Sequence, residues 1–121
     1  MNGIYDATYS LLRNGLDISL TRQKALSGNI ANLDTPGYVP RDVDFAQALD
    51  AATQSQSTGM SRPTIEVIER PDKAASADGN AVDLDMQMAR LSQNATFYSA
   101  TTRGMNRKLA LLRYAASEGG A

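Results

Sequence analysis

The sequence contains no cysteine, no histidine and no tryptophan among its 121 residues. Without thiolate or imidazole ligands, zinc fingers, iron–sulfur clusters and histidine-bound haem are excluded. Histidine is also the commonest general base near neutral pH, so the Ser-His-Asp and Cys-His catalytic arrangements are excluded as well. What remains is a carboxylate-based enzyme, a binding module or a structural protein, and we expect no metal and no cofactor.

Excess charge and long hydrophobic runs are missing too. The chain has 12 basic and 13 acidic residues, a net charge of −1, so it lacks the basic excess typical of a nucleic-acid-binding domain. No stretch approaches the roughly 18 apolar residues of a membrane-spanning helix, so we expect no direct membrane insertion. Residues 1–15 lack the basic and apolar regions of a cleaved secretory signal. These absences alone predict a cytoplasmic protein.

Both ends of the chain show heptad periodicity. In residues 4–33 and again in residues 81–116, apolar side chains recur every seven positions, with a second set interleaved between them. This spacing predicts two long helices that pair as an antiparallel coiled-coil hairpin. The residues predicted to form the hairpin seam are Leu12, Leu16, Leu26, Ile30, Leu84, Met88, Leu91, Tyr98, Met105, Leu109 and Leu112.

The middle of the chain, residues 34–80, has a different character. Thr35-Pro36-Gly37-Tyr38 favours a type II turn with glycine at the third position. Residues 45–52 could form a short helix, the polar residues 53–59 are expected to be a loop, and residues 64–69 favour a short edge strand. Asp78-Gly79-Asn80 is expected to cap the last helix. The prediction is a mainly α, single domain over residues 1–121 with a loop-rich middle region.

A second apolar row on the first helix cannot face the same partner as the seam, because one facing helix covers only the a and d positions. The apolar residues off the seam are Ile4, Leu11, Ile18, Phe97 and Leu111. Either a third short helix of the same chain folds back over them, or neighbouring subunits cover them. A hairpin of this size is marginal without a metal or a disulfide. We therefore favour a homo-oligomer and assign these five residues to inter-subunit contacts.

Two pairs of acidic residues are the candidates for chemistry. Asp42 with Asp44, and Asp83 with Asp85, have the residue type that carboxylate hydrolysis or a magnesium site uses. On a helix, however, side chains two residues apart diverge. Asp83 and Asp85 also suit the first turn of the last helix, where negative charge is favourable. We expect no enzymatic activity.

Residues 27–38, SGNIANLDTPGY, closely resemble the signature of flagellar rod, hook and hook–filament junction proteins. Within that family, residues 41–45, 78–85 and 105–114 look most like the proximal rod member. The positions that match the motif are Asn29, Asn32, Thr35, Pro36, Gly37 and Tyr38. We expect Pro36 and Gly37 to set the direction in which the chain leaves the helix. Asn29 and Asn32 are expected to bond to backbone groups freed at the helix end.

The resemblance implies a structural subunit that stacks helically around the export channel and transmits torque. It implies other rod proteins, the rod–base adaptor FliE and the export gate as partners. It also implies export by the flagellar type III apparatus without a cleaved signal, which places the protein in the periplasmic rod of the basal body rather than in the cytoplasm. The alternatives are another rod protein such as FlgC, or a cytoplasmic helical-hairpin adaptor or chaperone.

Overall fold

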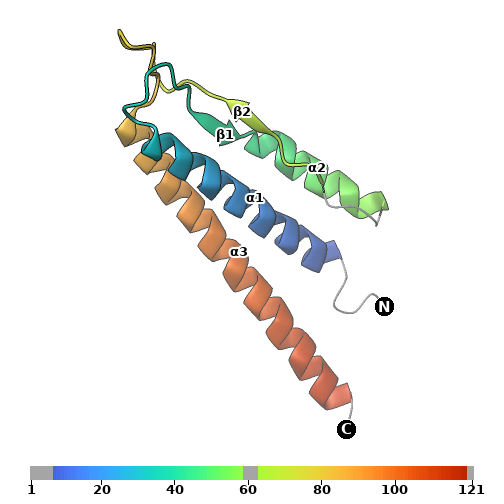
Figure 1. Cartoon of the computed structure of the whole chain (residues 1–121). Helices are drawn as coiled ribbons and strands as arrows, with labels where there is room; N and C mark the ends of the chain where they lie inside the picture. Colours follow the sequence, from blue (N-terminus) through green and yellow to red (C-terminus); the bar gives the residue numbers. More distant parts are fainter. Residues whose placement is uncertain (1–6, 59–62, 120–121) are drawn as a thin grey trace.

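Three helices and one pair of short strands make up the fold (Figure 1). The computed structural model describes residues 7–58 and 63–119. The elements in chain order are α1 (Ala7–Ala31), β1 (Arg41–Val43), α2 (Phe45–Thr58), β2 (Val67–Glu69) and α3 (Leu84–Gly119). The predicted mainly α class is confirmed, with α1 packed between α2 and α3. Within the described ranges, no helix is both long and apolar enough to cross a membrane.

The long helices α1 and α3 approach each other closely at two glycines. A Cβ atom added to Gly15 of α1 would lie 3.3 Å from Cγ2 of Thr101, and one added to Gly104 of α3 would lie 3.1 Å from Cδ2 of Leu12. Glycine costs about 1 kcal/mol relative to alanine inside a helix. At both positions, the absent side chain makes room for the facing helix.

The turn that follows α1 has the predicted type II geometry. Gly37 has a φ of 73°, and the N–H of Tyr38 donates to the carbonyl of Thr35 at 3.3 Å. A second turn, around Gly79 with a φ of 83°, packs directly against the first. The N–H of Gly37 donates to the carbonyl of Asp78 at 2.9 Å, so the connection after α1 and the approach to α3 are joined.

The start of α3 lies three residues later than the expected start at residue 81. The side chain of Asn80 donates to the carbonyls of Asn32 and Thr35, and its oxygen accepts from the N–H of Val82. These bonds hold residues 80–82 against the turn in a non-helical conformation. Asp83 caps the helix instead, because its carboxylate accepts from the backbone N–H of Asp85 at 2.9 Å. Residues 78–80 form the turn expected before α3, but the cap predicted there is wrong.

Strand β1 pairs with β2 in antiparallel register, with Asp42 opposite Ile68, which confirms the short strand predicted within residues 64–69. Helix α2 begins directly after Asp44, whose carboxylate accepts from the N–H of Gln47. The helix continues to Thr58, so the loop expected over residues 53–59 is wrong as far as residue 58; Gly59 lies outside the described residues. Ala48 and Ala52 lie one turn apart on its buried face, and this packing favours helix beyond what the polar sequence suggests.

The hydrophobic core lies where α2 and β1 cover α1. Ile18, which is 0% exposed, packs with Val43 and Ala48. The ring of Phe97 meets that of Phe45 edge to face, with centroids 4.9 Å apart. Helix α2 of the same chain thus covers part of the second apolar row of α1. The assignment of Ile18 to an inter-subunit contact is therefore wrong. Phe97 is half-buried within the chain in the same way.

The remaining residues of that row are placed differently. Leu11 and Leu111 are exposed, Leu111 to 67%. Ile4 lies outside the described residues. Of the five residues predicted to make inter-subunit contacts, Leu11 and Leu111 are thus the ones that lie on the described surface.

We expect Ile18→Ala to lower the free energy of unfolding by about 3 kcal/mol, because the truncation leaves a cavity in a fully packed site. Leu20→Ala, two residues away on the exposed face of the same helix, is the matched control and should change stability by less than about 0.5 kcal/mol. Urea unfolding followed by circular dichroism measures both. Equal losses in the two variants would contradict this description of the core.

The two turn glycines should respond unequally to alanine. Gly37→Ala should cost about 1 kcal/mol, because an L-residue is strained at positive φ. Gly79→Ala should cost more, because its added Cβ atom would also lie 3.2 Å from Cα of Gly37. The urea midpoints of the two variants make the comparison. A Gly37→Ala variant less stable than Gly79→Ala would show that the packing of the two turns is unimportant.

Candidate functional site

The interface between α1 and α3 is polar along much of its length. Helix α3 buries a row of side chains spaced three and four residues apart, and α1 buries several polar residues opposite them. The buried polar residues of this interface are Asn14, Ser19, Arg22, Asn29, Gln87, Arg90, Asn94 and Thr101. Hydrogen bonds join the two helices, as between the hydroxyl of Ser19 and the side-chain carbonyl of Asn94 at 3.3 Å. A hydrophobic heptad pattern gives no signal for such a row.

The predicted seam residues are therefore distributed differently from the expectation. Leu26 is fully buried, while Leu84, Met88, Tyr98 and Leu109 of α3 are exposed, Met88 to 52%. The others are half-buried, namely Leu12, Leu16, Ile30, Leu91, Met105 and Leu112. On α3, the apolar stripe that the heptads predict lies beside the contact with α1 rather than inside it.

Asn29, one of the motif residues, joins three segments of the chain. Its side-chain amide donates to the carbonyl of Arg41 at 2.6 Å, and its oxygen accepts from the N–H of the same residue at 2.8 Å. It also donates to Gln87 of α3 at 2.9 Å and accepts from the hydroxyl of Tyr38 at 3.1 Å. The expectation that Asn29 caps its own helix is wrong, because its partner is the backbone at the start of β1.

Asn32 does what the sequence predicts. Its amide donates to the carbonyl of Gly28 in the last turn of α1 at 2.8 Å, and its oxygen accepts from the hydroxyl of Thr35 at 2.9 Å. The motif thus combines a helix end, a type II turn and an asparagine that fixes the segment beyond the turn.

Like Asn29, Asp42 joins segments that are distant in the sequence. Its buried carboxylate accepts from Nε of Arg22 at 2.9 Å and from Nη1 of Arg70 at 3.3 Å. The side chain of Asp42 is 0% exposed and that of Arg22 is 8% exposed. Since Arg22 lies on α1, Asp42 on β1 and Arg70 directly after β2, this ion cluster fixes the strand pair on the helix.

A second buried carboxylate, that of Asp72, fixes the first turns of α3. It accepts from Nη1 of Arg90 and from Nε2 of Gln87, each at 2.7 Å, and from the backbone N–H of Asp83. Gln87 is the residue that also bonds to Asn29. One connected network therefore extends from the end of α1 through the turn region into α3.

The candidate acid pairs thus have structural partners. Asp42 is paired with arginines, Asp44 caps α2 and Asp83 caps α3. Asp78 closes the turn before α3, where the Ser76 hydroxyl and then the Asn80 N–H lower the pKa of its carboxyl. In the part of the chain that the structure describes, no group of three or more acidic side chains is arranged to hold a metal ion.

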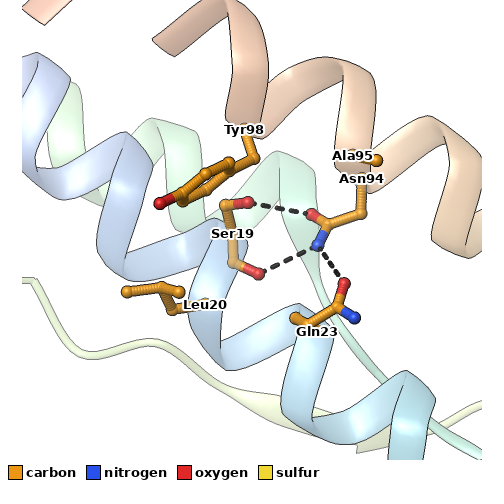
Figure 2. Close-up of a pocket in the computed structure, with 6 residues that line it drawn as sticks. All are labelled: Ser19, Leu20, Gln23, Asn94, Ala95 and Tyr98. Atoms are coloured by element: carbon orange, nitrogen blue, oxygen red, sulfur yellow. Dashed lines mark hydrogen bonds between the residues drawn. The ribbon is translucent and has the colours of Figure 1, made fainter. Parts of the chain in front are cut away.

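A shallow groove lies on the face of the hairpin between α1 and α3 (Figure 2). It has a volume of about 250 Å³ and is lined by Ser19, Leu20, Gln23, Asn94, Ala95 and Tyr98. The amide of Asn94 donates to the carbonyl of Ser19 and to the side chain of Gln23, so these polar groups satisfy one another. The groove consequently offers apolar contact from Leu20, Ala95 and Tyr98. It is suited to packing against another protein surface.

We expect Asp42→Ala to destabilise the chain by about 3–5 kcal/mol, because it leaves the buried guanidinium of Arg22 without its partner carboxylate. Asp50→Ala, at an exposed position of α2, is the control and should stay within about 0.5 kcal/mol of the parent. Thermal and urea unfolding give both values. Similar stabilities for the two variants would show that the ion cluster does not fix the strand pair.

Comparison with known proteins agrees with this arrangement. Residues 12–38, which contain most of α1, its end and the type II turn, match the family model described as flagella basal body rod protein. The matched segment includes Asn29 and Asn32, together with the turn from Thr35 to Tyr38. These are the residues that direct the chain from the helix to β1.

Similarity to individual relatives extends over most of the chain. The chain is 32% identical to the flagellar basal body rod protein FlgB of Salmonella typhimurium over 111 residues, covering 77% of this chain and 80% of the relative. It is 29% identical to FlgB of Aeromonas hydrophila, covering 87% and 89%. It is 28% identical to FlgB of Bacillus subtilis, covering 91% and 93%. The chain belongs to the FlgB family of flagellar basal body rod proteins.

Proposed function

We propose that the chain acts as a structural, non-enzymatic subunit of the proximal rod, assembling helically around the export channel and transmitting torque. The observation that carries this proposal is the apolar surface that the fold leaves uncovered on its two long helices. Leu20 of α1 lies beside Tyr98 of α3 at the open groove, and Leu111 is exposed further along α3. Burial of such surface is worth about 25 cal/mol per Å², which favours association with neighbouring subunits.

The same surface gives a role to the predicted seam and inter-subunit residues that the fold leaves accessible. Leu84, Met88, Tyr98 and Leu109 form an exposed stripe along α3. Leu11 and Leu111 are also exposed. We assign these six side chains to contacts between subunits, where neighbouring helices would complete the packing that a single chain lacks.

The polar interface between α1 and α3 suits a structural subunit that must resist shear. Buried hydrogen bonds and ion pairs are directional, so they specify one register between helices where an all-apolar seam tolerates sliding. Here the bonds of Asn29, Asp42 and Asp72 connect α1, β1, the turn region and α3. Shear between the two long helices would have to break several of these buried bonds together.

We further propose that the protein belongs to the periplasmic part of the rod and reaches it through the flagellar type III export apparatus without a cleaved signal. The family assignment supports assembly with other rod and basal body components; FliE and the export gate are the neighbours we expect. The small apolar core supports passage in an unfolded state. Ile18 and Leu26 are its largest buried apolar side chains in the described residues, and the rest are valines and alanines.

Deletion and complementation of the gene test the proposed function. Cells without the chain should lack rods and motility, the intact gene should restore both, and purified basal bodies should then contain the protein. A cytoplasmic adaptor or chaperone would instead remain in the soluble fraction and be absent from washed basal bodies. Motile cells after clean deletion would also contradict the proposal.

We expect Leu111→Asp to leave helix content unchanged but to abolish motility, because a carboxylate would replace an apolar side chain at a subunit contact. Ala110→Asp, at the neighbouring exposed position of α3, is the matched control and should retain motility. Swimming in soft agar and circular dichroism of the purified variants provide the readouts. Full motility in Leu111→Asp would remove this residue from the interface.

A further inference from the structure

The last turns of α3 extend beyond the described part of α1. Leu12 lies against Gly104, and Gly15 against Thr101. This antiparallel register brings Ala7, the first described residue of α1, level with Leu109. Residues 110–119 of α3 run on past it, as the red end of the helix in Figure 1 shows.

One exposed face at this end of α3 combines apolar side chains with positive charge. Leu111 and Tyr114 are exposed, Tyr114 to 66%, and the exposed Arg103 and Arg107 precede them on the same face of the helix, at spacings of three and four residues. From residue 103 to residue 119 the chain has four basic residues and one acidic residue, a net charge of +3. We call the exposed set Arg103, Arg107, Leu111 and Tyr114 the tail surface.

The opposite end of the hairpin has complementary chemistry. Acidic side chains accumulate around the two turns and the start of α3, where Leu84 and Met88 are also exposed. The basic residues closest to them in the sequence are Lys73 and Arg90, and Arg90 is paired with the buried Asp72. We call the set Asp34, Asp78, Asp83, Leu84, Asp85 and Met88 the head surface.

The two surfaces of one molecule are too far apart to satisfy each other. From Met88 to Arg103, the nearest members of the two surfaces on α3, the helix rises about 22 Å at 1.5 Å per residue. The Debye length at physiological ionic strength is only about 8 Å, so attraction between the ends of one chain is screened. The complementary charges can act only between molecules.

We propose that the tail surface docks on the head surface of an adjacent subunit, that is, on an acidic helix start with exposed leucine and methionine side chains. Leu111 and Tyr114 would bury their apolar area against Leu84 and Met88, while Arg103 and Arg107 would face the carboxylates. Tail-to-head contacts are heterologous, and such contacts extend into open helical assemblies when the rotation does not close a ring. This inference rests on the proposed rod function and names the surfaces that join successive subunits along its axis.

A second copy of this chain has a head surface of the stated chemistry, so the full-length protein serves as the probe. Two variants reverse the charge of one surface each, Arg103→Glu with Arg107→Glu on the tail, and Asp34→Lys with Asp85→Lys on the head. Sedimentation over a concentration series is measured for each variant alone and for an equimolar mixture. Circular dichroism confirms that each variant keeps its helix content.

The parent protein should self-associate, and more weakly at 500 mM than at 50 mM salt. Each end variant alone should lose association by at least about tenfold, because like charges then meet at the contact. Mixing the two variants should restore it, because the tail of each then matches the head of the other. A parent that stays monomeric, end variants that associate like the parent, or a mixture no stronger than its components would overturn the proposal.

A control pair separates this contact from attraction between oppositely charged proteins in general. Lys24→Glu with Arg41→Glu, and Asp50→Lys with Glu66→Lys, change the net charge by the same amounts at exposed positions that belong to neither surface. Each control variant alone should associate like the parent. Loss and mixing rescue in this pair equal to those of the end variants would also overturn the proposal.

Complementation of the deleted gene separates this inference from the proposed function. If the parent gene restores motility and the tail variant does so equally well, the tail contact is wrong while the rod function stands. If the parent gene is dispensable for rods, the proposed function itself fails.

Discussion

The two hydrogen bonds between the side-chain amide of Asn29 and the backbone of Arg41 are the constraint on which the rest of the fold depends. They hold the start of β1 against the last turns of α1, although the two residues are separated by a helix end and a tight turn. With β1 fixed there, Asp42 lies under Arg22, and Val43 packs on Ile18. Helix α2 then starts over α1 because it follows β1 directly. The same amide bonds to Gln87, so the register of α3 depends on the same residue.

Placing polar groups in the helix interface leaves the apolar stripes of α1 and α3 free. In a protein that works as a monomer, burying Asn94 and Gln87 while exposing Met88 and Tyr98 would waste hydrophobic stabilisation. In an assembled rod the arrangement is favourable. Directional bonds set the register within each subunit, and apolar area remains for the neighbours. A buried polar residue that fixes register at a cost in stability is well attested in coiled coils.

The parts of this fold that sequence could predict are those encoded by local chemistry. Periodicity predicted the two long helices, and Pro36 with Gly37 predicted the type II turn, because dihedral preferences act within a few residues. The core and the bonds of the site were less predictable. Ile18 appeared to need a neighbouring subunit because nothing in the sequence of α2 shows that it folds back onto α1. The seam on α3 was misplaced because hydrophobic periodicity identifies apolar side chains, whereas the contact is made by Gln87, Arg90 and Asn94, whose burial depends on partners distant in sequence.

The distribution of polarity also bears on how a subunit could be both exportable and rigid. Of the apolar side chains buried in the described residues, only Ile18 and Leu26 are large, so the apolar core contributes little to the stability of the free chain. The buried ion pairs add specificity more than net stability, because desolvation offsets much of their attraction. Unfolding a single subunit therefore costs little free energy, which would favour the passage through an export channel that we propose. In the assembly that we propose, the exposed leucines, methionines and tyrosines would become buried, and removing a subunit would require loss of that burial in addition to rupture of the internal bonds. Stability would thus be gained on assembly, where the rod must resist shear.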